Sequence, residues 1–238
     1  VSQSVAVTVA PTATADALRP RSSTNFDPRV ELVGIVTKFA PLVDGRFYAT
    51  GSFTTIDGPV RNGIARFPQN GNLHTSWTPA FISGTVNQIA VQGYVDAANP
   101  GKIVIGGTFN YVNGVNQFRL ARLNADGSLD TAFAAKIGSG VSGGNVNALA
   151  VHAASGKIAI GGAFSGVNST DATRIIRLNA DGSVDDTFVT GSGFDNNVNA
   201  LLFQPDGKLV VAGNFTSYNG TPAMRIVRLT DTGGIDGT

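Results

Sequence analysis

Short runs in which apolar and polar residues alternate recur along this chain. The alternation is clearest at 86–91, 146–151 and 198–203, and a looser version occurs at 36–41. A period of two is typical of a β-strand that buries one face. The pattern therefore predicts a strand at the beginning of each of four segments.

A glycine-containing turn and a second apolar run follow the predicted strands. The turn is Asp-Gly at 44–45 and 206–207, and Ser-Gly at 155–156. Asp-Gly between two apolar runs is typical of a β-hairpin, because glycine adopts the positive φ of a type I′ turn. Glycine pairs at 106–107 and 161–162 lie inside the second run, where they predict a bulge or the close approach of a neighbouring backbone.

Two further turns complete each segment. An Asn-Gly or Asp-Gly turn in most copies precedes a third apolar run, such as RLARL or RIVRL. A last turn, such as NADGSLDTAF, ends in an aromatic residue. Three turns between four short strands describe a four-stranded antiparallel meander, and radial repetition of such units is typical of a β-propeller.

The four segments align without gaps over their central part. Each has a basic residue after its first glycine and an arginine 20 positions later: Arg46 and Arg66, Lys102 and Arg122, Lys157 and Arg177, Lys208 and Arg228. We therefore predict an all-β fold, a β-propeller or propeller-like array of about four four-stranded antiparallel blades. The predicted repeat domain covers 26–238, with units at approximately 36–80, 86–135, 146–190 and 198–238.

The N-terminal residues 1–25 are rich in alanine, threonine and valine. We predict a linker or isolated strand here, and the tail of an export signal is a further alternative. Phe26 precedes Val36 by the same spacing that separates Phe188 from Val198. The N-terminal piece thus looks like the fourth strand of another copy. It would complete the last blade of a closed ring, and a fragment of a longer array predicts the same pattern.

The string GKIVIGGTF, then VNG, then RLARLNADGSLDTAF resembles the delta-60 repeat family, a bacterial β-propeller-type repeat. The resemblance runs from Val36 to Thr238. The first copy departs from it, with Arg46 in place of lysine and with His74 and Trp77 in its closing segment. The resemblance implies an exported protein, periplasmic, at the cell surface or extracellular, and no defined enzymatic activity.

Composition excludes several classes of function. The 238 residues carry a formal net charge of +1, which offers no basic surface for nucleic acid or anionic membranes. The absence of cysteine excludes disulfides and cysteine-based metal or catalytic sites. No run approaches 18 apolar residues, so we predict no membrane-spanning segment.

Candidate catalytic residues are scarce. The two histidines, His74 and His152, lie in different copies, and Glu31 is the only glutamate. No GxSxG, HExxH or Walker pattern occurs. The segment 138–143 fits GxGxxG, but it precedes a predicted strand rather than a helix. We therefore predict no catalytic residue, no cofactor and no enzymatic activity.

The acidic turns have two interpretations. Asn124, Asp126 and Asp130, like their counterparts in the third copy, supply oxygens that suggest a calcium loop. An Asx-type turn, in which Asn and Asp bond to the local backbone, accounts for the same residues more simply. We predict no metal site, and calcium stays open as the alternative. The arginines are expected to pair with these turns, Arg122 with Asp130 and Arg177 with Asp185.

Positions at which the copies differ are the better functional candidates. These are the segments 93–100 and 137–145 and the aromatic residues Trp77, Tyr94, Tyr111 and Tyr218. Tyr111 and Tyr218 lie at the second turn of their copies, so both are expected to project from one rim. Such aromatics anchor protein interfaces or stack on sugars. Packing between blades is the structural alternative.

The predicted function is a non-enzymatic, exported interaction or structural module. It would dock onto another protein, or onto a larger surface or membrane-associated assembly, through loops on one rim. A carbohydrate-binding propeller that uses Trp77 or Tyr111 is the alternative. A propeller-based hydrolase or lyase comes third, because its active site would need a cluster of His, Asp and Glu around the axis.

Overall fold

A computed structural model describes residues 31–93 and 101–237 of the chain. Four three-stranded antiparallel sheets follow one another, and the second strand is central in each. Unit one contains β2 (Val36–Pro41), β3 (Phe47–Gly51) and β5 (Ile64–Phe67), and unit two contains β6 (Val86–Gln92), β7 (Lys102–Gly107) and β10 (Leu120–Leu123). Unit three contains β12 (Val146–Val151), β13 (Ile158–Gly162) and β16 (Ile175–Leu178), and unit four contains β17 (Val198–Phe203), β18 (Leu209–Gly213) and β21 (Ile226–Leu229).

The structure corrects the prediction of a fourth strand in each unit, because the main sheet of every unit has three strands. In units two to four it is reduced to a single bridge: Leu123 with Leu129, Leu178 with Val184, and Leu229 with Ile235. In unit two the closing segment instead forms α1 (Thr131–Ile137). Asp130 caps this helix by accepting a hydrogen bond from Phe133 N at 3.3 Å. Three of its seven residues are alanine, the best helix former, so a helix outcompetes the expected strand.

The first hairpin of each unit contains a bulge, which the paired glycines predicted for units two and three. The register shifts between Val86 and Gln88, and the same shift recurs in the other three units. A Cβ on Gly107 would lie 2.1 Å from Thr85 O, which requires glycine at the bulge. A Cβ on Gly106 would lie 2.5 Å from Val146 Cγ1 in unit three. Both predicted roles, bulge and close approach, are confirmed.

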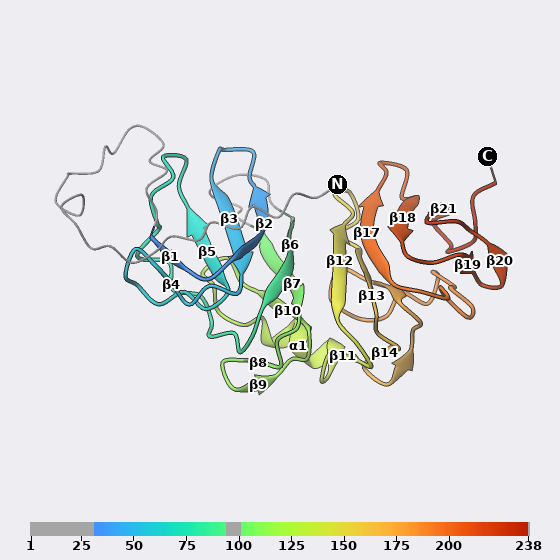
Figure 1. Cartoon of the computed structure of the whole chain (residues 1–238), viewed down its shortest axis with the longest axis horizontal. Helices are drawn as coiled ribbons and strands as arrows, with labels where there is room; N and C mark the ends of the chain where they lie inside the picture. Colours follow the sequence, from blue (N-terminus) through green and yellow to red (C-terminus); the bar gives the residue numbers. More distant parts are fainter. Residues whose placement is uncertain (1–30, 94–100, 238) are drawn as a thin grey trace.

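The second turn of each unit projects as a small hairpin. These hairpins are formed by β8 (Tyr111–Val112) with β9 (Val115–Asn116), β14 (Gly166–Val167) with β15 (Thr170–Asp171), and β19 (Ser217–Tyr218) with β20 (Thr221–Pro222). In unit one, β4 (Thr55–Ile56) pairs with β1 (Leu32–Val33), and in unit three β11 (Val141–Ser142) also joins the hairpin. We call the edge that bears these hairpins the hairpin rim. Part of it, with β8, β9, β11 and β14, lies at the bottom of Figure 1.

Most of the hydrophobic core lies between the units, and a further buried cluster with Phe53, Ile56 and Phe67 lies within unit one. The first strands β2, β6, β12 and β17 pack against one another in chain order. Tyr48 and Ile64 of unit one share a buried cluster with Ile103 of unit two, and Thr37 Oγ1 donates to Val86 O across the same boundary at 2.7 Å. Similar clusters join units two and three, and units three and four. The units therefore follow one another as the blades of a propeller, with units one and four at opposite ends of the array (Figure 1).

Within the described part of the chain, no helix combines the length and the hydropathy needed to cross a membrane.

Candidate functional site

The repeated basic residues converge on one carboxylate in three of the four units. In unit two, Asp130 Oδ2 accepts from Arg122 Nε at 2.8 Å and from Lys102 Nζ at 2.6 Å. The same triads recur in units three and four: Lys157, Arg177 and Asp185, and Lys208, Arg228 and Asp236. The predicted pairing of Arg122 with Asp130 and of Arg177 with Asp185 is confirmed. Sequence reasoning missed the lysines as partners, although their fixed spacing was visible.

In units two and three, the triad holds its carboxylate ionised. Burial opposes the ionisation of Asp185, but hydrogen bonds from Lys157, Thr187 and Arg177 outweigh it and hold the pKa of this carboxyl well below its usual range. The pKa of Asp130 is lowered in the same way. Because the triad recurs in three units and each ion pair joins the strands and the closing turn of one unit, we assign it a structural role.

The acidic turns adopt the predicted Asx geometry. Asp126 Oδ1 accepts from Ser128 N at 2.9 Å and from Ser128 Oγ at 2.7 Å. Asp181 and Ser183 repeat both bonds at 3.0 and 2.7 Å. Across 31–93 and 101–237, no group of three or more histidine or acidic side chains is placed to hold a metal ion.

Trp77 lies between units rather than at the surface. Its side chain is buried, its ring meets Tyr48 edge to face at 5.6 Å, and its Nε1 donates to Ala125 O of unit two at 2.9 Å. The alternative left open by the sequence, packing between blades, therefore describes Trp77.

Tyr218 is also buried, so the prediction that it projects from the rim is wrong. Its hydroxyl donates to Gly233 O at 2.7 Å, and burial raises its pKa to about 12. Tyr218 is the second residue of β19, whereas Tyr111 is the first residue of β8. Since a shift of one residue reverses the face of a strand, Tyr218 corresponds to the buried Val112.

Among the predicted aromatic residues within 31–93 and 101–237, Tyr111 is the one that faces solvent, with 44% of its surface exposed. Its strand is flanked by Ile82, which bridges to Val112. Both of these residues are buried, so the alternate positions Phe81 and Tyr111 share the outer face. Phe81 is 54% exposed and its N–H donates to Asn113 Oδ1 at 2.7 Å. We define Phe81 and Tyr111 as the hairpin patch; Val115, which is 46% exposed, pairs with Val112 and lies on the opposite face of the hairpin.

A groove of about 530 Å³ lies beside the hairpin patch. Its walls are β9 and the segment after it on one side and α1 on the other, and it is lined by Leu129, Val115, Asn116, Gln117, Thr131, Ala134, Ala135, Gly138 and Ser139. Gln117 ties the two walls together, since its Nε2 donates to Gly138 O at 3.0 Å. The Oε1 atom of Gln117 is buried and has no hydrogen-bond partner. The groove is thus mostly apolar, with one acceptor that is not satisfied.

The groove depends on residues that differ between copies. Its second wall is α1, which forms only in unit two among the described residues. The candidate segment 137–145 continues from this helix through Gly140, which bridges to Phe118, to β11. The lining residues carry no carboxylate, imidazole or ammonium group, so the groove is suited to binding rather than to acid–base chemistry.

A second cavity, of about 320 Å³, lies at the junction of units three and four. At the preceding junction, Gln92 Nε2 reaches across to Gly156 O at 2.6 Å and fills the equivalent space. His152 stands at the position of Gln92, and its ring lies 5.2 Å from that of Phe203 with Nε2 3.4 Å from Pro205 O. The cavity is lined by His152, Ser155, Lys157, Arg177, Thr187, Phe203, Asp206, Gly207, Asp231 and Thr232.

Two of the predictions from the sequence lie outside the described residues. These are Tyr94, with most of the segment 93–100, and the N-terminal piece 1–25 with Phe26.

Four segments of the chain, 44–76, 101–133, 153–188 and 204–238, match a family described as a domain of unknown function (DUF5122) beta-propeller. Each segment lies inside one of the predicted units, and together they make up more than half of the chain. Among curated proteins, none matches the chain at a significant level. The sheets, their order and the matched segments agree, and the chain belongs to the DUF5122 beta-propeller family.

Proposed function

We propose that this chain is a non-enzymatic interaction module that docks onto another protein through the hairpin rim of unit two. The observation that carries the proposal is the groove between β9 and α1, whose lining residue Asn116 pairs with the exposed Tyr111 across the hairpin. Scattered apolar residues are ordinary on a surface, whereas an aromatic patch beside a shaped groove favours a protein contact.

The chemistry of the groove suggests the kind of partner. Alanine and valine side chains favour an apolar anchor. The net charge of +1 supplies no strong steering field. A segment that inserts one apolar side chain fits these features.

We also propose a narrower assignment within this family. We assign the chain to the delta-60 repeat group within this β-propeller family. On that assignment the protein is exported, periplasmic, at the cell surface or extracellular, and part of a larger surface or membrane-associated assembly.

The test uses two arginine substitutions on the same helix. Ala135 lines the groove and Ala132 does not, and both are exposed. Ala135→Arg should block the groove and abolish co-purification of a stoichiometric partner from the native envelope. Ala132→Arg should leave co-purification unchanged. Equal recovery of the partner with both variants would overturn the proposal, as would the absence of any stoichiometric partner for the wild-type chain.

The cavity at the junction of units three and four favours carbohydrate binding as a second candidate. An aromatic ring, Phe203, lies beside carboxylate, hydroxyl and basic groups, which is the combination that sugars require. A glycan array should then give hits that Asp206→Asn weakens. Asp44→Asn, at the equivalent turn of unit one, is the matched control. An array without hits would exclude this candidate and leave the groove unaffected.

A further inference from the structure

A backbone carbonyl in the closing turn of a unit accepts hydrogen bonds from the preceding unit at two of the three boundaries. Between units one and two, Ala125 O accepts from Trp77 Nε1 at 2.9 Å. Between units two and three, Ala180 O accepts from Gln92 Nε2 at 3.0 Å and from Arg122 Nη1. Side chains of the earlier unit thus satisfy this acceptor at both boundaries.

Gln92 satisfies three partners at once. Its Nε2 donates to Gly156 O at 2.6 Å as well as to Ala180 O. Its Oε1 accepts from Arg122 Nη1 at 2.7 Å. One buried carboxamide therefore serves two backbone acceptors and one guanidinium donor. The boundary between units two and three shows which chemical group fits this set of partners: an amide, which presents a carbonyl oxygen and an N–H together.

The boundary between units three and four has the same three partners but no glutamine. Arg177, Gly207 and Asp231 occupy the aligned positions one unit later, and all three line the cavity at this boundary. His152 replaces the glutamine. Its ring nitrogens contact the hydroxyl of Ser155 and a backbone carbonyl of unit four, and neither of them contacts the three partners.

The guanidinium of Arg177 keeps one donor without an acceptor. Its Nε donates to Asp185 Oδ2 at 2.6 Å and its Nη2 to Thr187 Oγ1 at 3.3 Å, whereas Nη1 has no acceptor in the part of the chain that the structure describes. The side chain is 4% exposed, so this donor is largely removed from bulk water. Among the same residues, no donor reaches Gly207 O or Asp231 O. A ligand group that supplies the missing partners therefore gains affinity.

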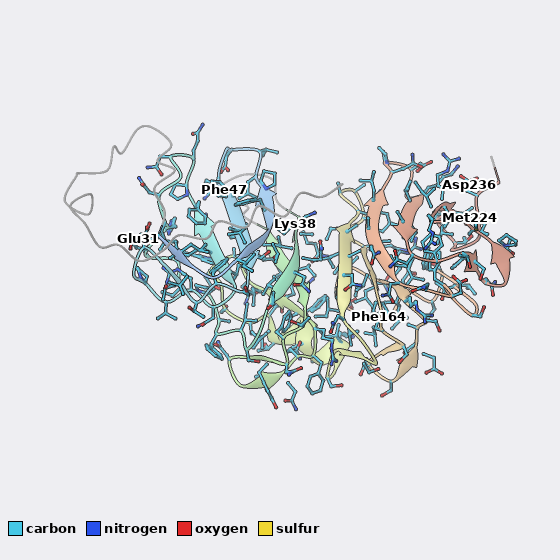
Figure 2. All side chains as sticks on the ribbon, viewed as in Figure 1. Glu31, Lys38, Phe47, Phe164, Met224 and Asp236 are labelled. Carbon is cyan, nitrogen blue, oxygen red and sulfur yellow. The ribbon has the colours of Figure 1, made fainter. Side chains whose placement is uncertain are left out.

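We propose that this cavity binds the acetamido group of an N-acetylated amino sugar. The acetamido carbonyl would accept from Arg177 Nη1, and its N–H would donate to Asp231 O. The ligand would lie between units three and four, which Figure 2 shows side by side, with Phe164 labelled in one and Met224 in the other. Because this proposal rests on carbohydrate binding, the second candidate function, the groove of unit two has no part in it.

The rest of the cavity favours a sugar over a peptide side chain as the source of the amide. Its volume of about 320 Å³ is larger than a single carboxamide, and the ring of Phe203 lies in its wall. Ser155, Asp206 and Thr232 add hydroxyl and carboxylate groups, which hydrogen-bond to sugar hydroxyls. A sugar ring attached to the acetamido group would therefore meet both an aromatic surface and polar partners.

A comparison of three sugars on the full chain tests the proposal. Titrations followed by NMR chemical shifts should show N-acetylglucosamine binding at least about tenfold more tightly than glucose or glucosamine, since the acetylated sugar alone supplies the carbonyl oxygen and the amide N–H. Free glutamine carries a carboxamide but no sugar ring. It should bind more weakly than N-acetylglucosamine.

His152→Gln is the matched test of the site. The new glutamine has the partners that Gln92 uses one boundary earlier, so its carboxamide should occupy the place of the acetamido group. Binding of N-acetylglucosamine should fall at least about tenfold, and the melting temperature should not fall. His74→Gln makes the same change in unit one and should leave binding unchanged.

The outcomes separate this proposal from the functions proposed for the chain. Equal affinity for N-acetylglucosamine and glucose would overturn the acetamido assignment and leave carbohydrate binding in place. Tighter binding of glutamine would overturn it in favour of a peptide side chain. Unchanged binding by His152→Gln would move the ligand to another site. If no sugar binds, carbohydrate binding fails together with this proposal, whereas the groove is tested independently by Ala135→Arg.

Discussion

The closing segments of units one and three occupy equivalent positions but are held by different interactions. In unit three, Asp185 accepts hydrogen bonds from Lys157 and Arg177, and the Arg177 guanidinium lies 4.5 Å from the centre of the Phe188 ring. An ion pair and a cation–π contact therefore hold the aromatic residue that packs between units.

In unit one, the ion pair cannot form and the equivalent arginine, Arg66, lies over a different ring, with its guanidinium 5.9 Å from the centre of Tyr48. His74 stands at the position of Asp185, and Trp77 packs edge to face on Tyr48 and donates to Ala125 O. Arg46 pairs with the neighbouring Asp44 at 2.6 Å instead. Aromatic packing and a hydrogen bond thus replace the ion pair, which shows that the position serves packing between units rather than a shared chemical function.

The largest effect is expected for Trp77→Ala. It removes the buried ring from the contact between units one and two, and should lower the free energy of unfolding by about 3–5 kcal/mol in denaturant titration. Trp77→Phe keeps a ring and loses the bond to Ala125 O, so about 1–2 kcal/mol is expected. A loss below about 1 kcal/mol for the alanine variant would show that Trp77 does not hold this contact.

The ion pair of unit three is expected to come next. Asp185→Asn leaves Arg177, whose side chain is 4% exposed, without its carboxylate, and should cost about 3 kcal/mol. Asp186→Asn, at the exposed neighbouring position, should be close to neutral. Because the pKa of Asp185 is lowered on folding, its stabilisation is complete above about pH 4 and is lost as the pH falls below that value. The Asp185→Asn variant should lack this loss of stability in acid.

A smaller effect, an increase in the free energy of unfolding, is expected when a carboxylate is introduced into unit one at the position that Asp185 occupies in unit three. His74→Asp places a negative charge near Arg66 and Arg46, whose positive charges act on His74. The free energy of unfolding at neutral pH should rise by about 0.5–1 kcal/mol. Ser76→Asp, two residues away and exposed, should not reproduce the gain. A destabilised His74→Asp variant would mean that the arginines cannot reorient toward this position.

The smallest expected effect is a pH dependence of the free energy of unfolding that comes from His74. Burial and the nearby Arg66 lower the pKa of His74. The folded imidazole therefore binds fewer protons than the unfolded one, whose pKa is about 6.5, so stability is complete above that value and falls as the pH drops through it. The loss should be on the order of a few tenths of a kcal/mol because the side chain is part exposed. His74→Gln should remove this slope between pH 7.5 and 5.5, and an unchanged slope would contradict the assignment.

Local features of the fold could be predicted because they depend on neighbouring residues. The bulge at Gly107, the Asx turn at Asp126 and the pairing of Arg122 with Asp130 all follow from short, repeated spacings. The helix α1 could not be predicted by alignment to the repeat, since the alanines that favour it are particular to this copy. The groove was missed for the same reason, because one of its walls is this helix.

Long-range features needed the tertiary structure. Tyr111 and Tyr218 look equivalent in the sequence, but a difference of one position in the hairpin exposes the first and buries the second. Phe81 does not stand out in the sequence, because it is a single aromatic residue. The tertiary structure places it in the hairpin patch, because its segment pairs beside β8.

The sequence by itself determined the repeat, its register and the first three strands of each unit, because hydrophobic period and turn chemistry act within a few residues. Only the tertiary structure decided which apolar faces are covered, because burial depends on what lies across the boundary between units. Ile175 and Ile226 occupy equivalent positions of β16 and β21, yet Ile175 is buried and Ile226 is exposed. Ile175 packs in one cluster with Val198 and Leu209 of unit four, which lie far from it in the sequence.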